Sequence, residues 1–327
     1  MTDYYPLLFK HVYQDYPWGG DQIIRRFNRS APPGIYAESW EVSDRAEGMS
    51  IVRNGPLAGQ PLADVLAEWG TALLGPNVPV DRFPLLIKLL DARETLSVQV
   101  HPDDAGAAEH GGEAKTEMWY VLDAEPDAAV YAGFRVPLDP DTFRREVANG
   151  TLEPLLNRVP VKAGDAVFMP GGRIHAIGAG CLMLEVQQNS NTTYRLYDWG
   201  RVGNDGQPRP LHIEQAISVI DWSPVSDGVT LPRRLEQTGD NTLWEVLDTD
   251  WFRMERLDVA ADWPTAYEGH SFHVLFAMDT PVTLHGAGQS LKLVPGTSCL
   301  IPAAVREYRL EPKGGKAQIL RIMLPSK

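Results

Sequence analysis

Short stretches in which apolar and polar residues alternate recur along the chain, and they predict a mainly β protein. The stretch 96–104 begins with alternating residues: Leu96, Val98 and Val100 are apolar, and the residues that follow each of them are Ser97, Gln99 and His101. Because side chains alternate across a strand, these three polar groups lie on one face. Pro102 ends the strand, since proline has no N–H to donate to a β ladder.

Some stretches depart from this alternation. Residues 61–74 have apolar side chains at helical spacing, and we also expect helices over 139–149 and 212–221. The run 84–90 is almost continuously apolar, yet it contains Lys88. That lysine either lines a cavity or extends its ammonium to solvent, and we expect that it extends to solvent.

Three stretches together carry a candidate metal site. A glutamine oxygen and an imidazole nitrogen side by side, from Gln99 and His101, are half of a site for a first-row metal. A second predicted strand adds Lys115 and Glu117 on one face, and a later stretch adds His175. A Gln-x-His pair alone is more often a polar surface pair, so the prediction depends on all three stretches. Two histidines, one glutamate and one glutamine are a suitable ligand set for one divalent ion per chain, and they favour zinc.

The stretch that contains His175 has a recognisable spacing of glycine and proline. Gly164, Pro170, Gly172 and His175 are separated by five, one and two residues. This resembles the second half of the cupin signature, whose strands and turns aim one histidine into a small β-barrel. The resemblance implies a mainly β fold of cupin (jelly-roll) β-barrels, with a metal-bearing catalytic barrel and a few helices.

The last hundred residues look like a degenerate copy of this barrel. Residues 293–307 align with 161–175, and Glu307 then takes the position of His175. We therefore predict a catalytic cupin domain with helical insertions over 1–225 and a smaller C-terminal cupin-like β domain without a metal site over 235–327. His273 aligns with Glu117, but the two alignments use different offsets. The histidines here are expected to be ordinary polar residues: His270, His273 and His285.

A polar strand face and a tight aromatic loop suggest where a ligand could bind. If the stretch 181–201 is one regular strand, it places six polar side chains on one face: Glu185, Gln187, Asn189, Asn191, Thr193 and Arg195. Such a face borders either water or a ligand cavity. Trp18, in a Pro-Trp-Gly-Gly loop, could stack on a sugar ring or cap an apolar core.

Composition narrows the partners. The 327 residues include 43 acidic and 30 basic ones, a net charge of -13, which argues against nucleic acid as a partner. No apolar stretch approaches the roughly 20 residues that a membrane span requires, so we expect no membrane partner. Two cysteines, Cys181 and Cys299, favour a reducing compartment, and we expect the cytoplasm.

The motifs taken together resemble one family. The chain carries, in order, W-G-G, E-S-W-E-V-S-D, F-P-L-L-I-K-L-L, L-S-V-Q-V-H-P-D-D, K-T-E-M-W-Y-V-L, P-G-G-R-I-H-A-I-G and Q-Q-N-S-N-T-T-Y-R-L-Y-D-W-G-R. This set is similar to the type I mannose-6-phosphate isomerases, especially their short bacterial form. The resemblance is dense over residues 6–225 and looser beyond.

The resemblance implies an enzyme that interconverts mannose 6-phosphate and fructose 6-phosphate. Its partner would be a small sugar phosphate and its cofactor a zinc ion. It implies that the zinc ligands are Gln99, His101, Glu117 and His175. It also implies that Lys115 and Ser97 lie near the phosphate or the hydroxyls. Trp18, from its loop alone, is the candidate for a further substrate contact. Arg195 matches an arginine needed for catalysis and Glu185 an acidic residue of the active site. Asn191 departs from the pattern, because family members often have aspartate there, and an amide cannot ionise.

The implied chemistry agrees with the residue types. Aldose–ketose isomerisation moves a proton between C1 and C2 through a cis-enediol, and a metal ion polarises the carbonyl. Either Glu185 or Lys115 could carry the proton, whereas Arg195 is too basic for that role and suits a developing oxyanion. Two other classes stay open: another metal-dependent cupin enzyme, and a non-catalytic sugar-sensing cupin.

Overall fold

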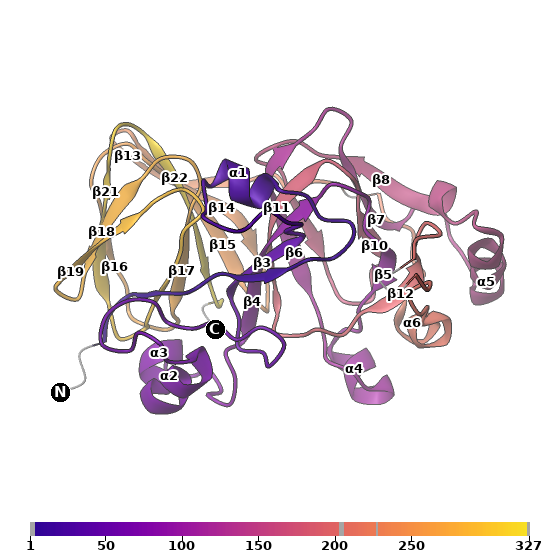
Figure 1. The fold of residues 1–327 in the computed structure, drawn as a ribbon, viewed down its shortest axis with the longest axis horizontal. Helices are drawn as coiled ribbons and strands as arrows, with labels where there is room; N and C mark the ends of the chain where they lie inside the picture. The colour runs from indigo at the N-terminus through magenta and orange to yellow at the C-terminus, as the bar shows by residue number, and fades with distance from the viewer. Residues whose placement is uncertain (1–3, 203–205, 227, 326–327) are drawn as a thin grey trace. The chain divides into compact units, whose positions relative to one another are not determined.

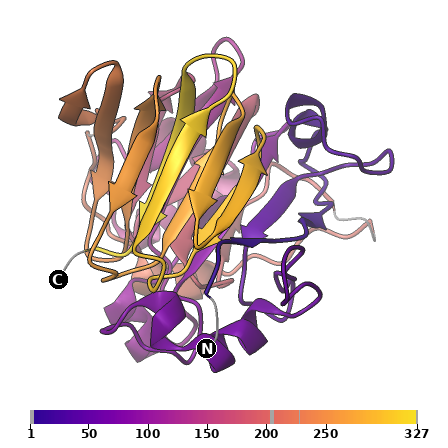
Figure 2. The same cartoon turned by 90° about the vertical axis from the view of Figure 1, so that its left-hand side faces the viewer.

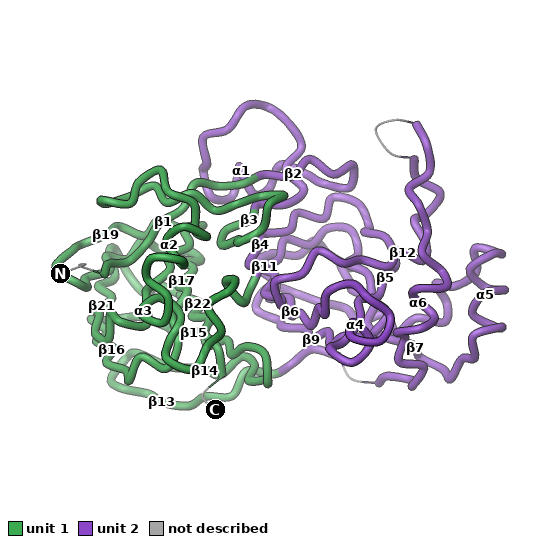
Figure 3. The backbone as a smooth tube through the Cα atoms, turned by 90° about the horizontal axis from the view of Figure 1, so that it is seen from below, with its two compact units in different colours: residues 1–12, 40–85, 231–327 green, residues 13–39, 86–230 purple. Residues whose placement is uncertain are grey.

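The computed structural model describes residues 4–202, 206–226 and 228–325. The chain divides into two compact units, each built from separate segments (Figure 3). Unit 1 comprises residues 1–12, 40–85 and 231–327, and unit 2 comprises 13–39 and 86–230. The domain limits 1–225 and 235–327 stay a prediction, because compactness alone does not show which segments fold independently.

Unit 2 contains an eight-stranded jelly roll. Its strands in chain order are β4 (Leu85–Ala92), β5 (Val98–Val100), β6 (Glu117–Ala124), β7 (Ala129–Phe134), β8 (Leu156–Pro160), β9 (Ala166–Met169), β10 (His175–Ile177) and β11 (Cys181–Gln188). One sheet has the order β4-β11-β6-β9 and the other the order β5-β10-β7-β8. Two further strands, β2 (Val12–Gln14) and β3 (Glu38–Val42), continue the first sheet beyond β4, and β12 (Tyr194–Tyr197) continues the second beyond β5.

Unit 1 repeats this arrangement strand for strand. Its strands are β15 (Arg253–Val259), β16 (Trp263–Ala266), β17 (His273–Ala277), β18 (Val282–Gly286), β19 (Gln289–Leu293), β20 (Ser298–Ile301), β21 (Glu307–Pro312) and β22 (Ala317–Met323). They form the sheets β15-β22-β17-β20 and β16-β21-β18-β19, the same order as in unit 2. The first of these is extended by β1 (Leu7–Leu8), β13 (Arg233–Thr238) and β14 (Asn241–Asp248).

In Figure 1 the two sheets of unit 1 form facing layers, and Figure 2 looks onto their orange and yellow strands. The predicted mainly β fold with two cupin-type jelly rolls is therefore confirmed. Each barrel encloses an apolar core, because alternate residues of both sheets point inward. In unit 2 this core includes Leu90, Trp119, Ala132 and Ile177.

The three predicted helices are present with small changes. The stretch 61–74 forms α2 (Leu62–Trp69) and α3 (Thr71–Leu74), which are separated by Gly70 at a φ of 50°. The other two are α5 (Pro140–Asn149), capped by the Asp139 carboxylate, and α6 (Ile213–Val219). The sequence interpretation missed two helices and a 3-10 turn: α1 (Gln22–Arg26), α4 (Asp104–His110) and η1 (Glu153–Leu155). Within the described ranges, no helix has the length and apolar character needed to cross a membrane.

The loop after β9 packs against the loop after β5 through two adjacent glycines, Gly171 and Gly172. A side chain at Gly171 would lie 2.5 Å from the Cα atom of Asp103, and the Gly172 N–H donates to the His101 carbonyl over 2.7 Å. The turn after β9 is thus fixed on the residues that follow β5. This close approach brings two of the predicted metal ligands, His101 and His175, to the same end of the barrel.

Candidate metal centre and active site

Three of the predicted metal ligands form one buried cluster in unit 2. His101 follows β5, Glu117 begins β6 and His175 begins β10. Their ligand atoms lie within 4.8 Å of one another, and each residue is at most 1% exposed. The Nε2 atom of His175 is 3.3 Å from Oε1 of Glu117, and the Nε2 atom of His101 is 3.6 Å from Oε2.

Both imidazole rings are oriented as metal-binding histidines usually are. The Nδ1 atom of His101 is 2.8 Å from the Thr192 carbonyl, and that of His175 is 2.8 Å from the Arg173 carbonyl. A carbonyl only accepts, so Nδ1 carries the proton and Nε2 turns its lone pair to the cluster. Burial lowers the pKa of His175 to about 4 and that of His101 well below its ordinary value. The two rings are therefore neutral and able to bind a cation.

The carboxylate of Glu117 lacks the hydrogen bonds that a buried carboxylate normally has. Among the described residues neither of its oxygens has a hydrogen bond of good geometry, although the Lys115 ammonium forms an ion pair with Oε2 at 2.8 Å. Burial raises the pKa of Glu117 to about 7 despite that lysine. Orphaned carboxylate oxygens that face two imidazole lone pairs fit a divalent cation, so this group could hold a metal ion.

The fourth predicted ligand, Gln99, lies beside the cluster. It pairs with His175 across β5 and β10, and its Nε2 atom is 3.4 Å from Nε2 of His175. Rotating the amide by 180° presents its carbonyl oxygen to the cluster instead, with the same shape of side chain. The structure thus brings all four residues together, while their role as a ligand set stays a prediction.

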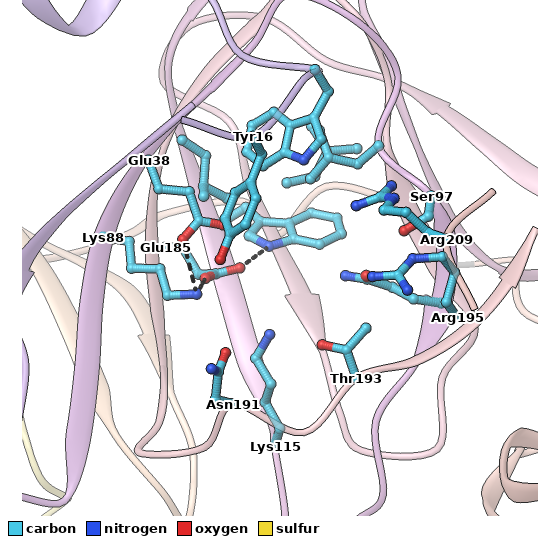
Figure 4. Close-up of a pocket in the computed structure, with 16 residues that line it drawn as sticks. Tyr16, Glu38, Lys88, Ser97, Lys115, Glu185, Asn191, Thr193, Arg195 and Arg209 are labelled. Carbon is cyan, nitrogen blue, oxygen red and sulfur yellow. Dashed lines mark hydrogen bonds and ion pairs between the residues drawn. The ribbon is translucent and has the colours of Figure 1, made fainter. Parts of the chain in front are cut away.

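A cavity of about 280 Å³ opens in unit 2 next to this cluster, and Gln99 and Lys115 line it. Figure 4 shows two groups of polar side chains on opposite sides, with Lys115 and Asn191 between them. The labelled residues are Tyr16, Glu38, Lys88, Ser97, Lys115, Glu185, Asn191, Thr193, Arg195 and Arg209.

One side of the cavity is a buried ion-pair network. The Lys88 ammonium lies 3.2 Å from Glu185 and 3.6 Å from Glu38, and the Trp119 indole donates to Glu185 over 3.1 Å (Figure 4). Burial would lower the pKa of Lys88, but the two carboxylates outweigh it and raise that pKa. The expectation that Lys88 extends to solvent is wrong: it is 5% exposed, because two carboxylates compensate its charge inside the barrel.

The other side carries two arginines. The Arg209 guanidinium is held by the Asp198 carboxylate through two hydrogen bonds of 2.7 and 2.6 Å, and Arg201 donates to the same carboxylate. Burial and the nearby Arg209 charge lower the pKa of Arg195. Its Nη1 donates to the Pro210 carbonyl, whereas its buried Nε has no partner among the described residues. Two guanidinium groups at one end of a cavity favour an anion there.

Ser97 and Trp18 both border the cavity, as their predicted contact with substrate requires. Trp18 also belongs to the apolar core of unit 2, as one of its two interpretations expects, while its contact with a sugar stays a prediction. Its ring stacks on Tyr16 at 5.8 Å. Gly19 permits this loop, because a Cβ there would lie 2.4 Å from the Cα atom of Ala37.

The stretch 181–201 is not one regular strand. β11 ends at Gln188, and β12 begins at Tyr194. Four of the six polar residues expected on one face line the cavity, but Gln187 and Asn189 do not. The break occurs where Gln187 donates to the Ser190 carbonyl and turns the chain.

Sequence reasoning missed three cavity residues, Tyr16, Glu38 and Arg209. Glu38 had a usable signal, since it lies in a short alternating strand one position before a serine that is also buried. Arg209 gave none, because it reaches the cavity from an irregular segment after β12.

The jelly roll and its buried His–Glu–His group define a cupin barrel that could hold a metal ion. Comparison with known proteins then places the chain more closely. Residues 7–132 match the model of the phosphomannose isomerase type I catalytic domain, and residues 244–324 match that of the mannose-6-phosphate isomerase cupin domain.

Individual relatives agree with these matches. The chain is 35% identical to "Probable mannose-6-phosphate isomerase GmuF" of Bacillus subtilis over 94% of its own length and 96% of that protein. It is 43% identical to a mannose-6-phosphate isomerase of Streptococcus mutans over 66% of its length and 67% of that protein. The crystal structure of mannose 6-phosphate isomerase from Bacillus subtilis has a TM-score of 0.88 at 31% identity, covering 97% of this chain and 99% of that one. This chain belongs to the type I phosphomannose isomerase family.

Proposed function

We propose that this chain is a zinc-dependent aldose–ketose isomerase that interconverts mannose 6-phosphate and fructose 6-phosphate through a cis-enediol. The observation that carries the proposal is the buried His–Glu–His group beside a cavity that has a carboxylate–lysine network on one side and two arginines on the other. A metal ion held by the His–Glu–His group could polarise a sugar carbonyl, and guanidinium groups bind phosphate through charge-assisted hydrogen bonds. Family membership supports the same activity.

The proposed metal ligands are His101, Glu117, His175 and Gln99. Nitrogen and oxygen ligands with two neutral imidazoles favour zinc among the abundant divalent ions. When bound there, the ion would act as a Lewis acid toward the sugar carbonyl. The carbonyl partners at both Nδ1 atoms keep the two imidazoles in the tautomer that binds a cation.

We assign the proton transfer between C1 and C2 to Glu185. It lines the cavity, it is 4% exposed, and its pKa is lowered because Lys88 and Lys115 outweigh the effect of burial. It is therefore ionised and can accept a proton at neutral pH, with its orientation fixed by Trp119 and Lys88. Lys115 contacts both His101 and Glu117, which suits a group that orients the reacting end of the sugar.

The arginine side would receive the rest of the substrate. Arg209 is oriented by Asp198, and it lies with Ser97 and Arg195 across the cavity from Glu185 (Figure 4). We assign the phosphate to Arg209 and Ser97, and we assign Arg195 to the charge that develops as the enediolate forms. Trp18 would pack against the sugar between the two sides.

The decisive experiment is a coupled assay on mannose 6-phosphate with purified protein before chelation, after chelation and after zinc is restored. We expect one divalent ion per chain by elemental analysis, loss of turnover on chelation, and recovery with zinc. Full turnover by metal-free protein would contradict the metal assignment. Binding of the sugar phosphate with no turnover in the zinc-loaded protein would instead favour a sugar-sensing cupin.

A second measurement tests the proton carrier. Glu185→Gln keeps the size and the Trp119 hydrogen bond but removes the base, so kcat should fall by about a hundred- to ten-thousandfold. Exchange of the C2 hydrogen of mannose 6-phosphate with deuterated water should fall with it, while zinc content stays at one per chain. If Lys115→Met loses exchange and Glu185→Gln does not, the proton belongs to Lys115.

A further inference from the structure

Unit 1 has a polar cavity of its own. Its volume is about 200 Å³, smaller than the 280 Å³ of the cavity in unit 2. Strands β16, β17 and β22 contribute Thr265, His273 and Arg321 to its lining, and the segment between β16 and β17 contributes Tyr267, Glu268 and His270. None of these residues belongs to the proposed isomerase site.

The cavity occupies the position that corresponds to the catalytic cavity of unit 2. In unit 2, Glu117 pairs with Met169 of β9, and Trp119 pairs with Glu185 of β11. In unit 1, His273 pairs with Ile301 of β20, and Leu275 pairs with Arg321 of β22. The shared register sets His273 in the place of Glu117 and Arg321 in the place of Glu185.

The charges at this position are already balanced. The Arg321 guanidinium donates to Glu255 over 2.7 Å from Nε, and the other oxygen of Glu255 forms an ion pair with Arg253 at 2.7 Å. Arg253 also faces the carboxylates of Glu245 and Asp248 at 3.7 and 3.6 Å. A cation with compensating carboxylates has little unbalanced charge to offer to an anion, so a ligand here need not be charged.

His273 presents a hydrogen-bond donor. The Tyr308 hydroxyl accepts from Arg321 at 3.4 Å, which leaves its own hydrogen available for Nδ1 of His273 at 3.0 Å, and we take the tautomer of His273 that accepts it. Burial and the Arg321 charge keep the pKa of His273 well below its ordinary value, so the ring is neutral. Its proton then resides on Nε2, which has no partner among the residues that the structure describes.

The rest of the lining also suits hydroxyl groups. The Thr265 hydroxyl is buried and has no hydrogen-bond partner within the described ranges. Glu268, at the exposed rim, offers a carboxylate, and Tyr267 offers an aromatic ring that stacks on His273 at 4.0 Å. An N–H donor, a hydroxyl, a carboxylate and aromatic surface are the groups that bind polyhydroxylated molecules.

We propose that the cavity of unit 1 is a second binding site, and that it takes an uncharged polyhydroxylated ligand of about the size of a monosaccharide. The donor on His273 would bind one ligand oxygen, and Thr265 would bind another. The site is independent of the isomerase chemistry, because its residues lie in another barrel.

The test is an NMR titration of the full zinc-loaded chain with free mannose, fructose and inorganic phosphate, observing the imidazole nitrogens. The signals of His273 should shift saturably with at least one free sugar and stay in place with phosphate. Because His273→Phe removes the observed ring, its sugar binding is measured by calorimetry instead, and it should be lost while kcat for mannose 6-phosphate stays unchanged. The matched variant His285→Phe, which removes a histidine of unit 1 outside the cavity, should retain the shift.

Thr265→Val keeps the shape of the side chain and removes one hydroxyl, so it tests the site even if His273→Phe does not fold. It should weaken sugar binding by about two- to tenfold, the usual effect of one neutral hydrogen bond. No saturable shift of His273 with either sugar would overturn the proposal. An equal shift with phosphate would also overturn it, in favour of an anion site.

Discussion

The two jelly rolls of this protein share a strand order and differ in what their equivalent positions carry. In unit 2 a lysine on β4 pairs with a glutamate on β11, Lys88 with Glu185. In unit 1 the corresponding strands β15 and β22 carry the reversed pair, Glu255 with Arg321. Both barrels therefore hold a buried ion pair between these two corresponding strands, and the positions of the positive and negative side chains are exchanged between the barrels.

The barrels diverge more at the opposite sheet. In unit 2, Gln99 on β5, His101 directly after it and His175 on β10 join the single carboxylate of β6. In unit 1, β16 carries Thr265, and Glu307 at the start of β21 is exposed. Over the described ranges, the His–Glu–His group of unit 2 is the one cluster of three such ligands. The candidate metal group of unit 2 thus combines residues from both sheets, a combination that the described residues of unit 1 do not repeat.

The largest expected effect separates the two histidines that the barrels place near these positions. His175→Ala should lose the metal ion and the turnover of mannose 6-phosphate, because it removes one of the proposed ligands. His273→Ala should keep one metal ion per chain and leave turnover largely unchanged. Elemental analysis beside the coupled assay measures both. Loss of metal from the His273 variant would break the contrast between the barrels.

The ion pair of unit 1 should matter for stability rather than for turnover. Arg321→Met leaves the buried carboxylate of Glu255 with fewer partners. The free energy of unfolding should therefore fall by about 3–5 kcal/mol. Urea unfolding measures this, and kcat of the folded variant should be unchanged. Combining it with Glu255→Leu should recover part of the loss. A stable single variant with reduced turnover would mean that the second barrel contributes to catalysis.

Arg195 tests whether the arginine side of unit 2 acts in catalysis or in binding. Arg195→Met should retain the metal ion and reduce kcat by about a hundred- to a thousandfold, with little change in KM, since the charge it stabilises exists only in the transition state. Steady-state kinetics with a metal analysis decide this. Normal kcat with a raised KM would move Arg195 to the phosphate group together with Arg209.

Arg209→Met should act on phosphorylated substrates alone. Loss of one charge-assisted contact costs about 1.5–3 kcal/mol, so kcat/KM for mannose 6-phosphate should fall by about ten- to 150-fold. The value for free mannose should stay near that of the parent. Lys115→Ala is the variant to compare with it. If Lys115 orients the reacting end of the sugar, kcat/KM should fall for both substrates, and if it binds the phosphate, kcat/KM should fall for mannose 6-phosphate alone.

The smallest effect concerns pH. Lys88 and Lys115 lower the pKa of Glu185 against the effect of burial, so Lys88→Met should raise it. A base is lost when it is protonated, and a higher pKa moves that loss to higher pH. The acidic limb of the kcat profile should therefore move to higher pH, with the alkaline limb in place. A downward shift would remove Glu185 from the role of base.

Several features could be predicted from the sequence alone because they depend on local rules. Alternation along 96–104 placed Ser97 and Gln99 on one strand, and the glycine–proline spacing before His175 indicated the turn that aims it. The four proposed ligands, which the structure brings together, could thus be named from three short motifs. The helix at 140–149 followed from Asp139, whose carboxylate caps it.

Other features depend on contacts between residues far apart in the chain. The apolar run around Lys88 predicted a solvent-facing ammonium, because no local signal shows that Glu38 and Glu185, 50 and 97 positions away, neutralise it inside the barrel. Arg209 enters the cavity from an irregular segment, where two hydrogen bonds to Asp198 hold its guanidinium. The charge-reversed pair of unit 1 became visible only when the strand register aligned Arg321 with Glu185. Periodicity and spacing along the chain therefore predicted the strands and the candidate ligands. Tertiary packing decided which charges meet, because pairing across a barrel is set by register rather than by neighbours in sequence.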